Sequence, residues 1–233
     1  MATISCKNIT KVFSVGGQDI YALAGVDFEI QQGEFVVIVG PSGSGKTTLL
    51  NLLGGMDSPS SGDIFVGDKN IAKFNSRQLT DYRRNFIGFV FQFYNLMPNL
   101  TALENIELSV EICKSPLDPH EVLAQVGLLD RAKNFPAQLS GGEQQRVSIA
   151  RSVAKNSALI LCDEPTGALD YQTGKMILKL LHDICKKHNK TIILVTHNSA
   201  LKDMADKVLF VKNGVIEKMQ LNDNPKSIES IDW

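Results

Sequence analysis

A glycine-rich stretch, GPSGSGKTT at residues 40–48, is the feature that most constrains the fold of this chain. It follows an uninterrupted apolar run, Phe35 to Val39, and precedes Leu49 to Leu53, which has the character of a helix start. A strand, a glycine-rich loop and a helix in this order are the context in which the pattern G-x-x-x-x-G-K-[ST] predicts phosphate binding. The sequence therefore predicts a nucleotide site at a strand–loop–helix unit.

The residue types in this loop suit a triphosphate and its metal ion. Glycines let the backbone curl so that successive N–H groups point at phosphate oxygens, and the following helix adds its positive N-terminal end. We expect Lys46 to bridge the β- and γ-phosphates and the Thr47 hydroxyl to hold Mg²⁺. A plain glycine-rich turn is the alternative, which the placement of the lysine and threonine disfavours. The predicted phosphate-binding residues are Gly40, Pro41, Ser42, Gly43, Ser44, Gly45, Lys46, Thr47 and Thr48.

The composition indicates an ordinary globular protein. The 233 residues are 43% hydrophobic and 21% charged, which supplies ample material for a core. The net charge of −1 argues against a nucleic-acid partner, because nucleic-acid-binding domains are usually basic. The cysteines are scattered without a CxxC pair, which fits a reducing cytosol and a buried free thiol at Cys162. Because no leader pattern or spanning apolar run is present, we expect neither a membrane span nor a cleavable signal.

The N-terminal part of the chain is expected to form a small antiparallel sheet beside the nucleotide. Residues 3–30 contain short β-like runs around a turn signal at Ser14–Gln18, and residues 63–71 predict another hairpin. Phe13 is the aromatic candidate for stacking on an adenine ring. Burial of Phe13 in the core is an equally acceptable alternative from its position alone.

Two buried strands farther along the chain end in polar residues. The apolar run from Ile87 ends in Gln92, where α/β folds place ligand-contacting groups, although many strands end in glutamine. The run from Ala158 ends in Asp163 and Glu164. Asp163 suits Mg²⁺ through its water shell, and Glu164 suits orienting or deprotonating the attacking water. A solvated acidic turn is the alternative interpretation of this pair.

A third apolar run, residues 191–197, ends in His197. Its imidazole is expected to hydrogen-bond the γ-phosphate or its leaving group. The other histidines lie in polar helical contexts and are expected to face solvent. Residues 208–216 predict an Asn-Gly hairpin, and the polar tail from Asn222 onward is expected to be frayed.

A helical region is predicted between these strands. Residues 101–138 carry helical spacing without strand runs and are the best candidate for an inserted helical lobe. A further helix opens at Ser140, an expected N-cap whose capping box Glu143 completes. Gly141 and Gly142 in its first turn cost helix propensity, which favours a bare-backbone anion seat there. The chain thus carries a predicted second phosphate-binding helix end.

Together these motifs resemble the nucleotide-binding subunit of an ATP-binding cassette (ABC) transporter over about residues 2–219. The LSGG stretch upstream of the acidic strand end is the most specific of them. In chain order the resemblance assigns GPSGSGKT to Walker A, Gln92 to the Q-loop, LSGGE to the signature, LILCD to Walker B, Glu164 to the catalytic glutamate, Ala168–Asp170 to the D-loop and His197 to the switch histidine. The sequence departs from many relatives at Phe13, where tyrosine is common, and at Glu143, where glutamine is commoner.

The resemblance implies ATP hydrolysis by a head-to-tail dimer of two copies, with each signature facing the Walker A motif of the other. It implies catalytic roles for Lys46, Gln92, Glu164 and His197, and Mg²⁺ coordination by Thr47, Gln92 and Asp163. The nucleotide would contact Phe13, the Walker A residues and the signature residues Ser140, Gly141, Gly142 and Glu143.

At a finer level, IGFVFQFYNLMPNLTALENIEL, QLSGGEQQRVSIARSV and DEPTGALD are similar to the group that serves macrolide-type exporters, lipoprotein release and the cell-division complex (MacB, LolD, FtsE). Peptide-antibiotic (Bce-type) ATPases are close relatives of this group. The resemblance implies a separate membrane permease, typically with four spanning helices and an extracytoplasmic domain, and a place on the cytoplasmic face of the membrane. Export or extraction of a peptide, lipoprotein or drug-like substrate, or mechanotransmission, would follow.

Two other functions remain open from the sequence. A soluble ABC ATPase of repair or translation usually carries two cassettes or a long coiled-coil insertion, and this chain shows neither. A nucleotide-gated binding module with little turnover would carry the same motifs.

The predicted fold is α/β: a P-loop NTPase core with a mainly parallel sheet, an N-terminal antiparallel β subdomain and an inserted helical lobe. We expect one ABC nucleotide-binding domain over residues 1–233. The ATP-binding core would occupy about 1–95 and 155–219, the helical signature lobe about 100–154, and a tail 220–233.

Overall fold

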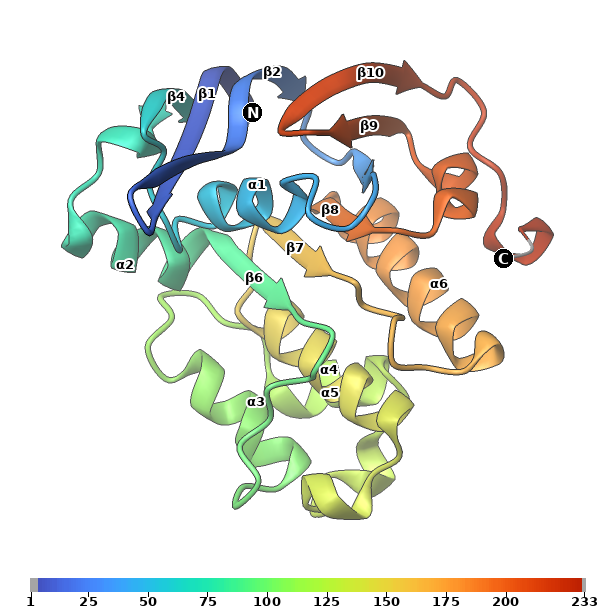
Figure 1. Cartoon of the computed structure of the whole chain (residues 1–233). Helices are drawn as coiled ribbons and strands as arrows, with labels where there is room; N and C mark the ends of the chain where they lie inside the picture. Colours follow the sequence, from blue (N-terminus) through green and yellow to red (C-terminus); the bar gives the residue numbers. More distant parts are fainter. Residues whose placement is uncertain (1–3, 232–233) are drawn as a thin grey trace. The chain divides into compact units, whose positions relative to one another are not determined.

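The computed structural model describes residues 4–231, which form two compact units. One unit contains the residues up to Asp81 and those from Thr191 onward, and the other runs from Tyr82 to Lys190 (Figure 1). The strands are β1 (Ile4–Val15), β2 (Gln18–Ile30), β3 (Phe35–Val39), β4 (Ser61–Val66), β5 (Lys69–Asn70), β6 (Ile87–Val90), β7 (Leu159–Asp163), β8 (Thr191–Thr196), β9 (Lys207–Lys212) and β10 (Val215–Leu221). The helices are α1 (Lys46–Leu53), α2 (Ser76–Phe86), α3 (Ala102–Val110), α4 (Pro119–Gln125), α5 (Gly141–Ala154) and α6 (Tyr171–His188).

The first unit contains the expected antiparallel sheet, in the order β2-β1-β4-β5 (Figure 1). The β1–β2 hairpin turns at Gly16 and Gly17, whose φ values of 59° and 80° suit a tight hairpin turn, so the predicted turn is confirmed. The β4–β5 hairpin turns at Gly67, as predicted for this region. β1 is one long strand rather than separate short runs, because bulges between Cys6 and Ile9 absorb the breaks in its alternation.

Four strands of the first unit lie in the order β10-β9-β3-β8, with β3 parallel to both of its neighbours. Every residue of β3 is buried, which explains why this strand is continuously apolar in sequence. The β9–β10 hairpin turns at Asn213 and Gly214, with φ values of 49° and 77°, so the predicted Asn-Gly hairpin is confirmed.

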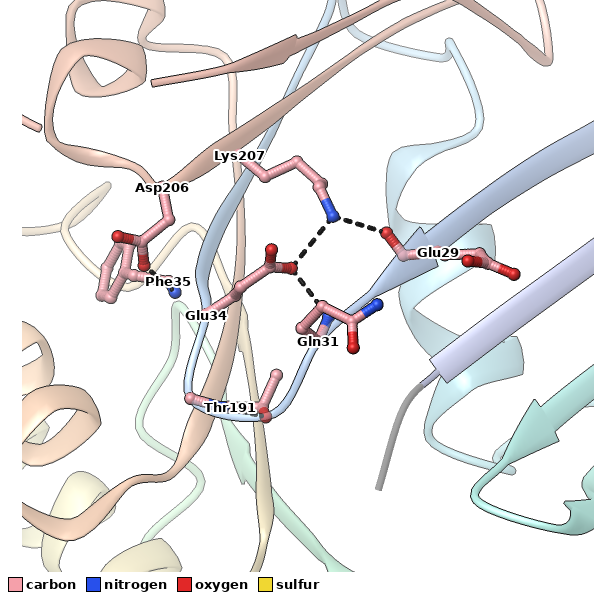
Figure 2. A network of polar contacts seen from close by, with 8 residues as sticks. Glu29, Gln31, Glu34, Phe35, Thr191, Asp206 and Lys207 are labelled. Carbon is pink, nitrogen blue, oxygen red and sulfur yellow. Dashed lines mark hydrogen bonds and ion pairs between the residues drawn. The ribbon is translucent and has the colours of Figure 1, made fainter. Parts of the chain in front are cut away.

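A polar network fixes the loop that leads into β3 (Figure 2). The Lys207 ammonium donates to the Glu29 carbonyl oxygen at 2.8 Å and to the Glu34 carboxylate at 3.0 Å. The Phe35 backbone N–H donates to the Asp206 carboxylate at 2.6 Å. Because these contacts join the ends of β2, β3 and β9, they set where β3 begins and so where the glycine-rich loop follows it.

The second unit pairs β6 with β7 in parallel and surrounds them with helices (Figure 1). α3 begins with a capping box between Thr101 and Glu104, and α4 begins at Pro119 with Asp118 as its N-cap. α6 is capped by Asp170, whose side chain accepts from the Thr173 N–H. The predicted helices are therefore present where local cap signals and apolar spacing placed them. Cys162 on β7 is buried and unpaired, as predicted.

The expectation of a frayed C-terminal tail is wrong for its described part. Ile228 and Ile231 are 8% and 4% exposed, so the tail contributes to a core. The Asn222 side-chain amide donates to the backbone oxygens of Lys202 and Ala205, at 2.9 and 2.7 Å. The sequence prediction gave weight to the polar composition of the tail and overlooked Ile228 and Ile231, two apolar residues spaced three positions apart. Across residues 4–231, no helix combines the length and the apolar character needed to cross a bilayer.

Replacing Lys207 with methionine should lower the free energy of unfolding by about 3 kcal/mol, because Glu34 would remain as a largely buried carboxylate without its cation. Urea unfolding measures this change. The double variant Lys207→Met/Glu34→Gln should recover part of the loss, since the amide carries no charge and still accepts from the Gln31 N–H.

The matched control is Lys212→Met on the same strand, where the ion pair with Glu217 is 55% and 51% exposed. That pair should contribute less than about 1 kcal/mol. Equal losses in Lys207→Met and Lys212→Met would contradict the role of the network in Figure 2.

Candidate functional site

The glycine-rich loop ends at the uncapped N-terminus of α1. Gly45 occupies the N-cap position with φ 104° and provides no side-chain hydrogen bond to the first turn. The N–H groups of that turn lack intrahelical partners by geometry, so they are available to an anion. Lys46 is 8% exposed, and its ammonium donates to the Gly40 and Pro41 carbonyl oxygens at 2.9 and 2.8 Å. The backbone N–H donors of the first turn of α1 and the Lys46 ammonium therefore lie together at this loop.

Ser44 strengthens the case for a ligand at this loop. Its side chain is 3% exposed, and its hydroxyl oxygen has no hydrogen-bond partner within the described part of the chain. A buried hydroxyl without a partner costs free energy, and a phosphate oxygen is a partner of suitable chemistry. The residues present at this loop thus fit a polyphosphate.

Packing fixes the loop glycines in a way that sequence reasoning missed. A Cβ on Gly40 would overlap the carbonyl oxygen of Val211 on β9, and a Cβ on Gly45 would overlap that of Ala22 on β2. Gly43 has φ 75° and open space around it, so its backbone conformation alone favours glycine. Both the neighbouring strands and a phosphate thus require bare backbone here. No local sequence signal reports on contacts with residues so far away.

Phe13 lies on β1 and is 41% exposed, which excludes the alternative that it is a core residue. The Lys11 ammonium lies 5.0 Å from the centroid of the Phe13 ring. Lys11 is itself held by the Asp57 carboxylate at 2.7 Å and the Ser58 carbonyl oxygen at 2.8 Å. A cation over one face steadies the ring, which suits stacking of a base on the ring. Adenine stacking stays a prediction.

His197 lies in the same unit as the glycine-rich loop. β3 and β8 are parallel, with Val39 opposite Thr196, so their carboxyl ends lie side by side. The structure therefore brings the backbone of His197 next to the start of the loop at Gly40. His197 is exposed and follows β8 by one residue, so the strand ends earlier than the sequence predicted.

The second unit brings Gln92, Asp163 and Glu164 together. β6 and β7 are parallel, with Val90 opposite Cys162, and Asp163 is the last residue of β7. Gln92 follows the end of β6 by two residues, so it lies on the loop and not on the predicted strand end. A Cβ on Gly167 would lie 3.0 Å from the Gln92 amide nitrogen, and the Gly167 N–H donates to the Glu164 carbonyl oxygen at 3.0 Å.

The N-terminus of α5 carries the predicted capping box. The Glu143 N–H donates to the Ser140 hydroxyl oxygen at 3.3 Å, and the Ser140 N–H donates to the Glu143 carboxylate at 2.7 Å. These hydrogen bonds from the Ser140 backbone and hydroxyl hold the pKa of Glu143 below its ordinary value, and Arg131 at 3.5 Å adds to the effect. Glu143 is therefore anionic at neutral pH. Its charge opposes an incoming phosphate, while the helix end favours one.

The glycines of α5 also have a packing cause inside the second unit. A Cβ on Gly142 would overlap the Thr173 methyl group on α6, and one on Gly141 would lie 2.7 Å from the Tyr94 hydroxyl oxygen. Packing against Thr173 therefore accounts for Gly142 without an anion, whereas the contact at Gly141 is with the end of a tyrosine side chain that can move aside. The anion seat at Ser140–Glu143 stays a prediction that needs its own test.

The predicted Mg²⁺ donors are chemically suitable. Thr47 offers a hydroxyl in the first unit, and Gln92 and Asp163 offer an amide and a carboxylate in the second. Mg²⁺ prefers such oxygen donors and usually keeps waters and phosphate oxygens among its ligands. In residues 4–231 there is no group of three or more His, Cys, Asp or Glu side chains placed to hold a metal. A site completed by a nucleotide is consistent with this sparse donor set.

Comparisons with known proteins agree on one family. The family model described as "ABC transporter" matches residues 23–167. An ABC transporter ATP-binding protein of Mycoplasma pneumoniae, the MG065 homolog, is 45% identical over 99% of this chain, which spans 50% of that protein. The lipoprotein-releasing system ATP-binding protein LolD of Idiomarina loihiensis is 41% identical over 94% of this chain and 98% of its own length.

A solved structure is also similar. It is described as a dimeric post-hydrolysis state of the ATP-binding cassette MJ0796 bound to ADP and Pi, from Methanocaldococcus jannaschii. The TM-score is 0.85 at 40% identity, over 94% of this chain and 98% of that one.

Replacing Gly142 with alanine should lower the free energy of unfolding by about 1–3 kcal/mol, because the added methyl overlaps Thr173. Adding Thr173→Ser removes the obstructing methyl and should restore most of the loss, and Thr173→Ser alone is the control. Thermal and urea unfolding measure these changes. A Gly142→Ala variant as stable as the parent would contradict the packing explanation.

Proposed function

The chain belongs to the ABC transporter family, and we propose that it is the ATP-hydrolysing subunit that drives a separate membrane permease. Proteins of this class are ABC ATPases, which hydrolyse ATP to ADP and phosphate. The observation that carries the proposal is the glycine-rich loop itself. It joins an uncapped α1 N-terminus, the buried cation of Lys46 and the partnerless hydroxyl of Ser44.

In this proposal the first unit binds the nucleotide. Phe13 stacks on the adenine, and the N–H groups from Gly43 to Thr48 bind the phosphates. Lys46 leaves the Gly40 and Pro41 carbonyls and bridges the β- and γ-phosphates. His197 donates a hydrogen bond to the γ-phosphate and so stabilises the charge that develops there.

The second unit supplies the water chemistry. Glu164 orients a water molecule and accepts its proton as the water oxygen attacks the γ-phosphorus. The bond from this phosphorus to the oxygen that bridges the β- and γ-phosphates then breaks, and ADP leaves with that oxygen. Thr47, Gln92 and Asp163 would hold Mg²⁺, which when bound neutralises phosphate charge.

We infer that the working form is a head-to-tail dimer of two copies. The similar MJ0796 structure is described as dimeric and bound to ADP and Pi, which supports this arrangement. In it, Ser140 to Glu143 would contact the nucleotide held by the partner's loop. The capping box pairs the Glu143 N–H but leaves the Gly141 and Gly142 N–H groups without intrahelical partners, which suits this role.

An exposed apolar surface in the second unit supports docking of a permease. Large apolar side chains in the loop after β6, on α3 and in the turn after α3 are 73%, 53%, 52% and 59% exposed; they are Phe93, Met97, Leu108 and Ile112. Exposed apolar side chains that gather into one patch are typical of protein–protein contact sites. In this proposal the permease has four spanning helices and an extracytoplasmic domain. This chain binds the permease at the cytoplasmic face of the membrane.

The substrate is proposed only as a chemical class. Similarity to a lipoprotein-releasing ATPase favours export or extraction of a lipoprotein, peptide or drug-like molecule, or mechanotransmission. Co-purification of a permease distinguishes this function from that of a soluble ABC ATPase. Phosphate release with the permease present distinguishes it from a nucleotide-gated module with little turnover.

Replacing Glu164 with glutamine should lower kcat by at least about 100-fold, because the amide cannot accept the proton. ATP binding should persist, so the variant should accumulate as an ATP-bound dimer in size-exclusion chromatography. Glu121→Gln on α4 is the control for a change of charge at an exposed residue. Unchanged turnover in Glu164→Gln would remove the assigned role.

A further inference from the structure

We propose that Gln145 is a positioning residue that sets the separation between Gln92 and Glu164, an inference that rests on the function proposed above. Gln145 lies on α5, one helical turn beyond Gly141, and its side chain is 0% exposed. It lies in the same unit as Gln92 and Glu164. It lies within the stretch QLSGGEQQRVSIARSV, but the motifs assign it no role.

The Gln145 amide group joins the two chain segments that carry these side chains. Its Nε2 donates to the Pro165 carbonyl oxygen at 2.8 Å and to the Phe91 carbonyl oxygen at 3.3 Å. Pro165 directly follows Glu164, and Phe91 directly precedes Gln92. A single planar NH₂ group thus fixes the spacing between both backbones at the point where the functional side chains leave them.

The two hydrogen bonds of Gln145 hold a turn whose backbone conformation needs support from its neighbours. Glu164 has φ 47°, a left-handed conformation that is uncommon for a residue with a side chain and that neighbouring contacts must hold. The Gly167 N–H closes the turn on the Glu164 carbonyl oxygen, and the Gln92 side chain lies against Gly167. Gln145 also holds this turn at Pro165, its second residue, so a shift of that carbonyl would disturb the backbone beside Glu164.

Other α5 side chains hold β6 or the loop after it but not the Glu164 turn. Ser152 donates to the Phe89 carbonyl oxygen at 2.7 Å, and Arg151 donates to the Tyr94 and Asn95 carbonyl oxygens at 2.7 Å each. Gln145 differs because it also reaches Pro165. Its orientation is determined, since Nε2 must face the two carbonyl acceptors, while Oε1 has no hydrogen-bond partner in the described residues.

An amide with one partnerless buried oxygen is a poor choice for stability alone. An unpaired buried acceptor costs on the order of 1–3 kcal/mol, which offsets much of what the two donated bonds contribute. The particular contribution of Gln145 is therefore geometric. Because it belongs to the signature helix, the position of α5 also sets the relation of Gln92 to Glu164.

The test compares Gln145→Leu, which removes both donors, with Gln145→Asn, which keeps an amide but shortens its reach. We expect kcat to fall about 10- to 100-fold in Gln145→Leu and less in Gln145→Asn, because small misplacement of reacting groups is costly. The Mg²⁺ concentration for half-maximal ATPase should rise, while KM for ATP changes less than about 3-fold, since the phosphate loop is untouched.

Hydrogen exchange gives a readout that needs neither turnover nor metal. In Gln145→Leu, exchange should speed up in both segments, residues 91–97 and 164–169, by about 10-fold or more. Ser152→Ala is the matched control, because it removes one buried bond from α5 to β6, the strand that leads into this loop, without reaching Pro165. Its effect should stay near residues 87–91, with kcat within about 2-fold of the parent.

The proposal would be overturned if Gln145→Leu and Ser152→Ala showed the same kcat, the same Mg²⁺ dependence and the same hydrogen exchange. If Gln145→Leu fails to fold, Gln145→Asn decides in the same three measurements. Glu164→Gln in the same assay separates the two levels of inference. Normal turnover in Glu164→Gln removes the role that the proposed function assigns to Glu164, whereas lost turnover there with a normal Gln145→Leu overturns the positioning role alone.

Discussion

Backbone-to-backbone contact around the glycine-rich loop is the constraint on which the first unit depends. The loop approaches β2 and the β9–β10 hairpin so closely that no side chain fits at Gly40 or Gly45. Gly214 of the hairpin donates to the Ser44 carbonyl oxygen at 3.0 Å and accepts from the Ala24 N–H at 2.9 Å. The phosphate loop is thus held by main chain on two sides. This arrangement pre-orients its N–H groups without relying on flexible side chains.

The second unit depends in a similar way on α5. Side chains of this helix reach backbone oxygens along β6 and the loop after it: Lys155 to Ile87, Ser152 to Phe89, Gln145 to Phe91, and Arg151 to Tyr94 and Asn95. Burial lowers the pKa of Lys155 and Arg151, yet both retain carbonyl partners. Hydrogen bonds therefore join the signature helix to the Q-loop and to the Glu164 turn, which suits the proposed transmission of movement between a permease and the nucleotide.

Local signals explain what the sequence could predict. The strand–loop–helix unit follows from an apolar run, a motif and a leucine run, and the hairpins follow from Gly16-Gly17 and Asn213-Gly214. The start of α6 follows from its Asp170 cap. The candidate residues could be named because each motif carries its own residue types, although their roles remain proposals.

The features that escaped prediction all depend on residues distant in sequence. Lys11 meets Phe13 only because Asp57 and Ser58 hold its ammonium. The packing of Gly142 against Thr173 on α6 could not be foreseen, because the sequence does not report which side chain faces this glycine. Gln145 lies within the stretch QLSGGEQQRVSIARSV, but the motif assigned it no role, since its role comes from two carbonyl oxygens on different segments.

The central claim is that each ATP site combines the glycine-rich loop of one copy with the signature residues of the other. Dimers of defined composition test this claim most directly. One dimer carries Lys46→Ala in one copy and Ser140→Arg in the other, and a second dimer carries both substitutions in one copy beside a parent copy. A head-to-tail arrangement leaves one intact site in the first dimer and none in the second. We therefore predict that the first retains up to about half of the parent ATPase rate and the second almost none. The reverse result, with activity in the second dimer alone, would contradict the account, because each copy would then hold a complete site.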